Sequence, residues 1–365
     1  MTPRLELRGV DKRFGGVQAV AGLDLALAAG EFLSLLGPSG CGKSTTLAMI
    51  AGFERADAGD ILVDGAVVNA VSPRRRRIGL VFQDYAVFSR LTVRANLSFG
   101  LEARRVRRAE RRRAVAAMAE TLGLTDILDH RGHGLNMSEM QRVALGRVLI
   151  VEPELLLLDE PMSNLDAAMR ADLRGELKQI QRRLGQSVLY VTHDQVEAMS
   201  MSDRIAVMNA GALLQVGSPE DIYHRPNSRF VAEFIGDPPI NVVPCDLRRD
   251  GAGLVATTAR HVNLALGQGD IAPGPHWLAV RPHDIAVTRE VGAGTMPGVV
   301  RFVENIGAEH VLHVAYGEDL LRVVVAPGFA ALDDTVHLAL DPARMHLIER
   351  DSDRVVPRDA AGTAP

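Results

Sequence analysis

The segment from residue 37 to residue 45 combines glycines, one lysine and three hydroxyl side chains at the spacing of a phosphate-binding loop. It fits the pattern G-x-x-x-x-G-K-[ST], with an apolar run before it and a helical stretch up to Ile50 after it. Backbone amides of such a loop can surround the β- and γ-phosphates of a nucleotide, while Lys43 supplies positive charge and the Ser44 hydroxyl can ligate Mg²⁺. The residues predicted to line the phosphates are Gly37, Pro38, Ser39, Gly40, Cys41, Gly42, Lys43, Ser44 and Thr45.

Two carboxylates, Asp159 and Glu160, follow the apolar run Leu155–Leu158. Such a pair is common at the end of a strand and says little by itself. Beside a phosphate-binding loop, however, Asp159 would hold Mg²⁺, usually through water, and Glu160 would polarise an attacking water. The two motifs together therefore predict a site for a nucleotide with Mg²⁺.

Gln83 and His193 each follow a further apolar run, which suggests that they also stand at strand ends. Considered singly, Gln83 would be an ordinary strand-end glutamine and His193 a hydrogen-bonded core histidine. Their position within a set makes them informative. In chain order that set is Lys43, Ser44, Gln83, Asp159, Glu160 and His193.

The order of these residues resembles that of the ATP-binding cassette family, and the resemblance covers about Leu5 to Gly236. The segments Tyr190–Met199 and Val216–Tyr223 are similar to the histidine-loop region of the importer branch and to the helical segment after it. Ser163–Asp166 matches the D-loop of the family. The resemblance implies an ATPase that uses ATP and Mg²⁺.

The resemblance also implies a role for individual residues. His193 would contact the γ-phosphate, and Phe14 would stack on adenine, whereas on its own Phe14 would be a buried strand-end phenylalanine. The segment Asp84–Gly100 would receive the coupling helices of membrane-spanning subunits. The catalytic residues implied are Glu160, His193 and Lys43, and the Mg²⁺ ligands implied are Ser44, Gln83 and Asp159.

The signature of the family, Leu-Ser-Gly-Gly-Gln, is altered in this chain. The aligned residues are Leu135, Asn136, Met137, Ser138 and Glu139. Asn136, Ser138 and Glu139 are still assigned to the nucleotide, but the glycines that permit close backbone approach are lost and Glu139 adds negative charge. We therefore predict a weakened nucleotide contact. The alternative is a tolerated variant, in which Ser138 and Gln141 form a capping box at the start of the helix.

Alternating apolar runs and amphipathic stretches predict an α/β P-loop NTPase domain, which by the resemblance is an ABC cassette with a helical subdomain. Buried strands are expected over residues 31–36, within residues 151–158 and over residues 187–192, and a helix over 165–184 with Gly185 as its stop. The predicted domains are residues 1–236 for ATP binding, 237–350 for an accessory β domain and 351–365 for a loose tail.

The C-terminal part has many Gly and Pro turns between short alternating segments, which is typical of a small all-β domain, here predicted as an OB-like barrel. Phe234–Asn241, Ala279–Asp284 and Val303–Gly307 resemble the accessory β domain of carbohydrate-importer ATPases. This resemblance favours a sugar or polyol as the transported solute.

Composition limits the remaining possibilities. The 365 residues include 41 Lys and Arg against 45 Asp and Glu, so the chain lacks the overall basic charge of a nucleic-acid binder. The clusters Arg74–Arg77 and Arg104–Arg113 are interpreted as a solvated loop and a charged helix face. Cys41 and Cys245 offer no disulfide framework. No apolar run approaches the ~18 residues of a membrane span, and the first residues, which lack an apolar stretch, lead us to expect no secretory signal.

The resulting hypothesis is the ATP-hydrolysing subunit of an importer for a sugar or polyol, such as glycerol or glycerol phosphate, on the cytoplasmic face of the inner membrane. Its partners would be transmembrane permease subunits, indirectly an extracytoplasmic solute-binding protein, and a second ATPase subunit, which the altered signature favours as a different chain.

Alternatives are a soluble or regulatory nucleotide switch with little turnover, or an importer ATPase for polyamine, iron or sulfate. A GTPase would need an Asn-Lys-x-Asp motif, which is absent. A repair ATPase would need a long coiled-coil insertion, for which the spacing from Gln83 to Asn136 leaves no room.

Overall fold

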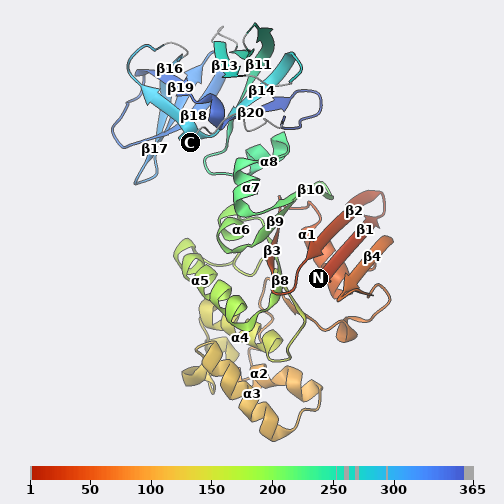
Figure 1. The fold of residues 1–365 in the computed structure, drawn as a ribbon. Helices are drawn as coiled ribbons and strands as arrows, with labels where there is room; N and C mark the ends of the chain where they lie inside the picture. Colours follow the sequence, from red (N-terminus) through yellow and green to blue (C-terminus); the bar gives the residue numbers. More distant parts are fainter. Residues whose placement is uncertain (1, 252, 259–262, 268–270, 293–294, 357–365) are drawn as a thin grey trace, which may run out of the picture. The chain divides into compact units, whose positions relative to one another are not determined.

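The computed structural model describes residues 2–251, 253–258, 263–267, 271–292 and 295–356 (Figure 1). The chain divides into two compact units, Met1–Pro219 and Glu220–Pro365. Hydrophobic side chains are packed within each unit, and each unit is described separately below.

The first unit contains an antiparallel sheet of order β2-β1-β4-β5 and a six-stranded sheet of order β10-β9-β3-β8-β7-β6. In the larger sheet β9, β3, β8, β7 and β6 run parallel, and β10 pairs antiparallel with β9. The strands are β1 (Leu5–Phe14), β2 (Val17–Leu27), β3 (Phe32–Leu36), β4 (Ala58–Val63), β5 (Ala66–Val67), β6 (Ile78–Val81), β7 (Leu155–Asp159), β8 (Ser187–Thr192), β9 (Arg204–Asn209) and β10 (Ala212–Gly217).

Both faces of the six-stranded sheet are covered, which explains why its central strands are continuous apolar runs. In β7, Leu155 and Leu157 belong to the core shared with α1 and the antiparallel sheet, whereas Leu156 and Leu158 belong to the core shared with α2 to α5. The helices of this unit are α1 (Lys43–Ala51), α2 (Val93–Ala103), α3 (Arg108–Thr121), α4 (Met137–Leu149), α5 (Ala167–Leu184) and α6 (Gln195–Met201).

The strands and the long helix predicted from the sequence are confirmed. The three expected strands correspond to β3, β7 and β8, and α5 ends at Leu184, where Gly185 adopts a left-handed φ of 60° as the cap. Helices α2, α3 and α4 pack on one another as the helical subdomain of the α/β unit (Figure 1).

The second unit is built mainly from two five-stranded antiparallel sheets, of order β13-β12-β11-β14-β20 and β15-β19-β16-β17-β18. Side chains from both sheets form a single core, which confirms the all-β prediction. The elements are α7 (Pro219–His224), α8 (Arg229–Phe234), β11 (Asn241–Asp250), β12 (Gly253–Thr258), β13 (Asn263–Gly267), β14 (Gly274–Val280), β15 (Ile285–Thr288), β16 (Met296–Asn305), β17 (His310–Tyr316), β18 (Asp319–Val325), β19 (Thr335–Leu340) and β20 (Met345–Glu349).

The compact units divide after Pro219, the first residue of α7, whereas the sequence places the domain limit after residue 236. One cause is the buried Arg281, whose guanidinium donates to the carbonyl oxygens of Ile235 (2.6 Å) and Tyr223 (2.5 Å) and stacks over the Tyr223 ring. These contacts join both helices to the β-strands. Residues 354 and 355 of the expected loose tail form β-bridges, and residues 357–365 lie outside the described residues.

Arg76 corrects the interpretation of Arg74–Arg77 as a solvated loop. Its side chain is only 5% exposed and donates to the carbonyl oxygens of Met49 and Ile50 (both 2.7 Å) and of Val71 (2.9 Å). Carbonyls in the last turn of a helix lack partners within the helix, so Arg76 satisfies the C-terminal end of α1. Burial lowers the pKa of this guanidinium. The helix that begins at the phosphate-binding loop is therefore anchored at its far end.

We predict that Arg76→Leu lowers the free energy of unfolding of the first unit by about 2–4 kcal/mol, because three buried carbonyls lose a charged donor. Chemical denaturation of the full chain measures this value. Arg75→Leu is the matched control, since the exposed Arg75 is its neighbour, and its effect should stay within about 0.5 kcal/mol. Equal losses in both variants would contradict the anchoring role.

Candidate functional site

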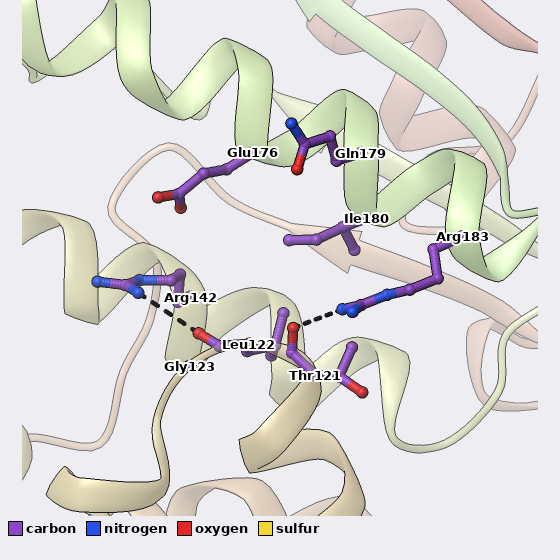
Figure 2. Close-up of a pocket in the computed structure, with 8 residues that line it drawn as sticks. All are labelled: Thr121, Leu122, Gly123, Arg142, Glu176, Gln179, Ile180 and Arg183. Carbon is purple, nitrogen blue, oxygen red and sulfur yellow. Dashed lines mark hydrogen bonds between the residues drawn. The ribbon is translucent and has the colours of Figure 1, made fainter.

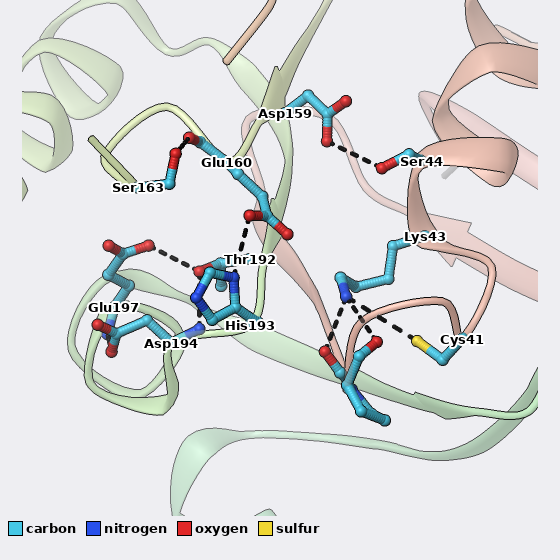
Figure 3. Close-up of polar contacts among 12 residues, drawn as sticks. Cys41, Lys43, Ser44, Asp159, Glu160, Ser163, Thr192, His193, Asp194 and Glu197 are labelled. Atoms are coloured by element: carbon cyan, nitrogen blue, oxygen red, sulfur yellow. Dashed lines mark hydrogen bonds and ion pairs between the residues drawn. The ribbon is translucent and has the colours of Figure 1, made fainter.

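The residues predicted to do chemistry follow three neighbouring strands of the parallel sheet. Strands β3, β8 and β7 are adjacent in that order. The phosphate-binding loop follows β3, Asp159 ends β7 and is followed by Glu160, and His193 comes directly after β8. Because parallel strands present their carboxyl ends at one edge, the sheet brings these segments together (Figure 3).

The phosphate-binding loop is shaped by two glycines that have no room for a side chain. A Cβ at Gly37 would lie 2.3 Å from the carbonyl oxygen of Met208, and a Cβ at Gly42 would lie 2.3 Å from that of Ala19. Gly42 also has a φ of 106°, which residues with a side chain rarely adopt. The backbone of the loop is thus in close contact with β9 and β2 where it leads into α1.

Lys43 is held inside the loop rather than at the surface. Its Nζ donates to the carbonyl oxygens of Gly37 (2.7 Å) and Pro38 (3.0 Å), and the Cys41 Sγ lies 4.0 Å away (Figure 3). Both oxygen partners are neutral carbonyls, so neither contact pairs the ammonium with a negative charge. This donor set fits the phosphates of a nucleotide.

Ser44 and Asp159 lie opposite each other across the site. The Ser44 hydroxyl donates to the Asp159 carboxylate over 3.3 Å. Burial, together with the charge of the neighbouring Glu160, raises the pKa of Asp159. A hydroxyl and a carboxylate oxygen are ligands that suit Mg²⁺, so the residues present fit this ion.

Glu160 and His193 form a second polar pair beside the loop. The His193 Nδ1 lies 3.0 Å from the Glu160 Oε2. Glu160 has a left-handed φ of 43°, and its backbone is fixed by its N–H to Val191 and by its carbonyl, which accepts from the Ser163 hydroxyl. A non-glycine residue in this conformation is costly and is often found at functional sites.

Two further predicted residues lie outside this network of hydrogen bonds. Gln83 is exposed, and its backbone carbonyl accepts from the Asn164 side chain over 3.4 Å. Phe14 is 47% exposed, with the Lys12 Nζ 4.9 Å from its ring centroid. The interpretation of Phe14 as a buried strand-end phenylalanine is therefore wrong, and its ring is available for stacking.

The altered signature does form a capping box, but between other residues than the sequence suggests. The Asn136 Oδ1 accepts from the Glu139 backbone N–H, and the Glu139 Oε2 accepts from the Asn136 backbone N–H, both at 2.9 Å. Ser138 lies one residue inside α4, so the predicted box of Ser138 with Gln141 is wrong. The carboxylate of Glu139 thus stands at the very start of the helix. Within the described part of the chain, no hydrogen bond joins Asn136, Ser138 or Glu139 to the site at the strand ends.

Two residues near the site were not singled out from the sequence. Glu197, in α6, accepts hydrogen bonds from Tyr190 and Thr192 in β8. Tyr85 is buried, its hydroxyl has no hydrogen-bond partner among the described residues, and burial together with the charge of Glu197 raises its pKa to about 12. The only sequence signal was that Glu197 falls within the importer-like segment Tyr190–Met199.

A separate hollow of about 290 Å³ lies between α5 and the helical subdomain (Figure 2). In it, Arg183 donates to the carbonyl oxygen of Thr121 (2.5 Å) and Arg142 to that of Leu122 (3.5 Å). The hollow shares no residue with the site at the strand ends. Its lining residues are Thr121, Leu122, Gly123, Arg142, Glu176, Gln179, Ile180 and Arg183.

Comparison with known families matches both units of the chain. A family model described as ABC transporter matches residues 20–163, and one described as TOBE domain matches residues 278–348. The second match lies within the all-β unit and agrees with the predicted OB-like domain.

Individual relatives are similar over almost the whole chain. The chain is 38% identical to an sn-glycerol-3-phosphate import ATP-binding protein of Rhizobium johnstonii, over 96% of both proteins. It is 43% identical to a trehalose/maltose import ATP-binding protein of Thermococcus litoralis, over 86% of this chain and 88% of that protein. Among solved structures, the chain is similar to cbiO1 from Clostridium perfringens, which is part of the ABC transporter complex cbiONQ. The TM-score is 0.57 and the sequence identity is 29%, and the match covers 61% of this chain and 91% of the cbiO1 chain.

Proposed function

The chain belongs to the ABC transporter family of ATP-binding proteins, and on this premise we propose that it hydrolyses ATP to drive the import of a sugar or polyol, such as glycerol or glycerol phosphate. The observation that carries the proposal is the set of strand ends in the first unit. There Lys43, the pair of Ser44 with Asp159 and the pair of Glu160 with His193 surround one space. The names of the relatives support the class of solute, since they concern glycerol phosphate and disaccharides.

Hydrolysis needs a charged pocket for the phosphates and a base for the water. The loop amides and Lys43 would bind the β- and γ-phosphates, with the Nζ exchanging its two carbonyl partners for phosphate oxygens. Phe14 would stack on adenine. Ser44, Gln83 and Asp159 would hold Mg²⁺, which supplies neutralisation of phosphate charge when it is bound.

Glu160 is the residue we assign to the water. Its carboxylate would orient the water and accept a proton as the oxygen forms a bond to the γ-phosphorus, while the bond from that phosphorus to the β–γ bridging oxygen breaks. His193 holds the Glu160 Oε2 at 3.0 Å and would contact the γ-phosphate. The products are ADP and inorganic phosphate.

The importer relatives imply membrane permease subunits as partners. We assign their docking to the segment Asp84–Gly100. Phe88 and Phe99 in this segment are partly exposed, and their ring centroids lie 4.7 Å apart in an edge-to-face contact. A hollow of about 150 Å³ adjoins them, lined in part by Phe82 and Phe99. Exposed aromatic rings beside a concavity are typical of protein interfaces.

Among the described residues, no helix is both long and apolar enough to span a membrane. The proposed location is therefore drawn from the family: a peripheral position at the cytoplasmic face of the inner membrane, bound to the permease subunits. A solute-binding protein on the other side would be an indirect partner.

We further propose that the working assembly contains a second, different ATPase subunit. In this family each ATP is expected between the loop of one protomer and the signature of the other. The Glu139 carboxylate at the start of α4 supports a poor signature here, since a negative charge at a helix N-terminus competes with phosphate. A partner with an intact signature would restore one good site.

The first prediction from this proposal is that Glu160→Gln retains ATP binding but lowers the rate of hydrolysis about 100-fold or more, because the water loses its base. Phosphate release and nucleotide titration measure the two quantities. Glu152→Gln is the matched control, as the exposed Glu152 lies before the opposite end of the same strand. Turnover near that of the unaltered chain in Glu160→Gln would exclude Glu160 from this role.

The second prediction concerns the signature. Purification of the transporter should yield two kinds of ATPase polypeptide. Restoration of this chain by Asn136→Ser, Met137→Gly, Ser138→Gly and Glu139→Gln should raise hydrolysis at the site that uses its signature, because the helix start regains glycine amides and loses the carboxylate. A single polypeptide species with full activity, and no change after restoration, would refute a second subunit.

A further inference from the structure

Glu197 is a carboxylate buried directly behind the segment that carries His193. Glu197 lies in the short helix α6 and is only 2% exposed. Its Oε2 accepts hydrogen bonds from the Tyr190 hydroxyl and the Thr192 hydroxyl, both at 2.7 Å. Burial raises the pKa of Glu197, and the two hydroxyl donors oppose that effect. The proposed hydrolysis does not itself use this carboxylate.

The Thr192 hydroxyl links Glu197 to the backbone next to His193, because it makes two hydrogen bonds. While its Oγ1 donates to Glu197, it also accepts from the backbone N–H of Asp194 over 2.9 Å (Figure 3). The residues before and after His193 are therefore joined through one hydroxyl, and the orientation of that hydroxyl is set by Glu197. A hydroxyl has a single hydrogen, so donation to Glu197 leaves its lone pairs free for the N–H.

Asp194 completes the restraint from the other side. Its Oδ1 accepts from the backbone N–H groups of Val196 (2.8 Å) and Glu197 (3.1 Å), which caps α6, and its Oδ2 lies 3.0 Å from the Arg170 guanidinium. The turn that presents the imidazole is thus closed on both flanks. From that turn the His193 side chain extends to the Glu160 Oε2.

We propose that Glu197 is a positioning residue, which acts through Thr192 to fix the turn around His193 and thereby holds the imidazole against Glu160. The inference rests on the proposed ATPase function, in which that pair faces the reacting phosphate. A small displacement of a catalytic group can cost up to about 100-fold in rate. Loss of this restraint should therefore lower kcat, with little effect on the KM for ATP, because the phosphate-binding loop is untouched.

The central test is Thr192→Val, which removes the hydroxyl and keeps the shape of the side chain. We expect kcat for ATP to fall about tenfold or more, with the KM for ATP unchanged within about twofold. Ser34→Ala is the matched control: Ser34 lies in the adjacent strand β3, paired with Tyr190, is fully buried and is hydrogen-bonded to Ser202. Its kcat should stay within about twofold of the unaltered chain.

Glu197 itself is tested by rescue. Glu197→Gln keeps an oxygen that can accept from both hydroxyls, so kcat should stay within a few-fold of the unaltered chain, whereas Glu197→Ala should lower it at least as much as Thr192→Val. If Glu197→Ala fails to fold, the comparison of Thr192→Val with Ser34→Ala decides alone. Equal loss of kcat in Glu197→Gln and Glu197→Ala would overturn the positioning role.

The assays use the purified transporter complex that contains this chain, because the proposed hydrolytic site takes its signature from a partner subunit. Absence of ATP hydrolysis by the complex with the unaltered chain would overturn the proposed function and this inference together. Hydrolysis by that complex, with kcat unaffected in Thr192→Val or equally lowered in Ser34→Ala, would overturn the inference alone. A rise in KM without a fall in kcat would also overturn it, since positioning of His193 predicts the reverse.

Discussion

The contact of the phosphate-binding loop with the backbones of β9 and β2 is the constraint on which the rest of the site depends. The loop can lie there only because Gly37 and Gly42 have no side chains. This path turns the chain back at the carboxyl end of β3 and begins α1 at Lys43, beside the ends of β7 and β8. Because β7 and β8 are parallel and adjacent, Asp159, Glu160 and His193 lie at the same edge of the sheet without any long loop. Ser44 lies in α1 and Asp159 ends β7, whereas Glu160 and His193 directly follow β7 and β8.

The elements that surround the site are fixed by contacts far along the chain. Arg76 anchors the end of α1, and the two faces of β7 join two separate cores. Asp159 and Glu160 therefore occupy positions set by packing, and the left-handed backbone at Glu160 is held by hydrogen bonds to Val191 and Ser163. The strain in that backbone is offset by the surrounding sheet.

The sequence predicted the fold class, the strands that carry the site and the glycine-lysine loop, because these depend on local patterns of apolar residues and glycines. It failed where the outcome depends on distant partners. Nothing local distinguishes Arg76 from the arginines beside it, since the carbonyls it binds belong to α1. Two capping patterns overlap at residues 136–141, and only the start of α4 at Met137 selects Asn136 with Glu139. Glu197 was missed because its hydroxyl partners, Tyr190 and Thr192, lie in a strand that was predicted only as a buried run.

The measurement that tests the account most directly is titration of the purified full chain with ATP and Mg²⁺, compared with Lys43→Ala. Lys178→Ala is the control, because Lys178 pairs with Asp203 and lies outside the site. We predict saturable binding by the unaltered chain and by Lys178→Ala, and affinity lowered about tenfold or more in Lys43→Ala, where the charge on the phosphates is lost. Equal affinity in all three proteins would contradict the assignment of the loop to the nucleotide.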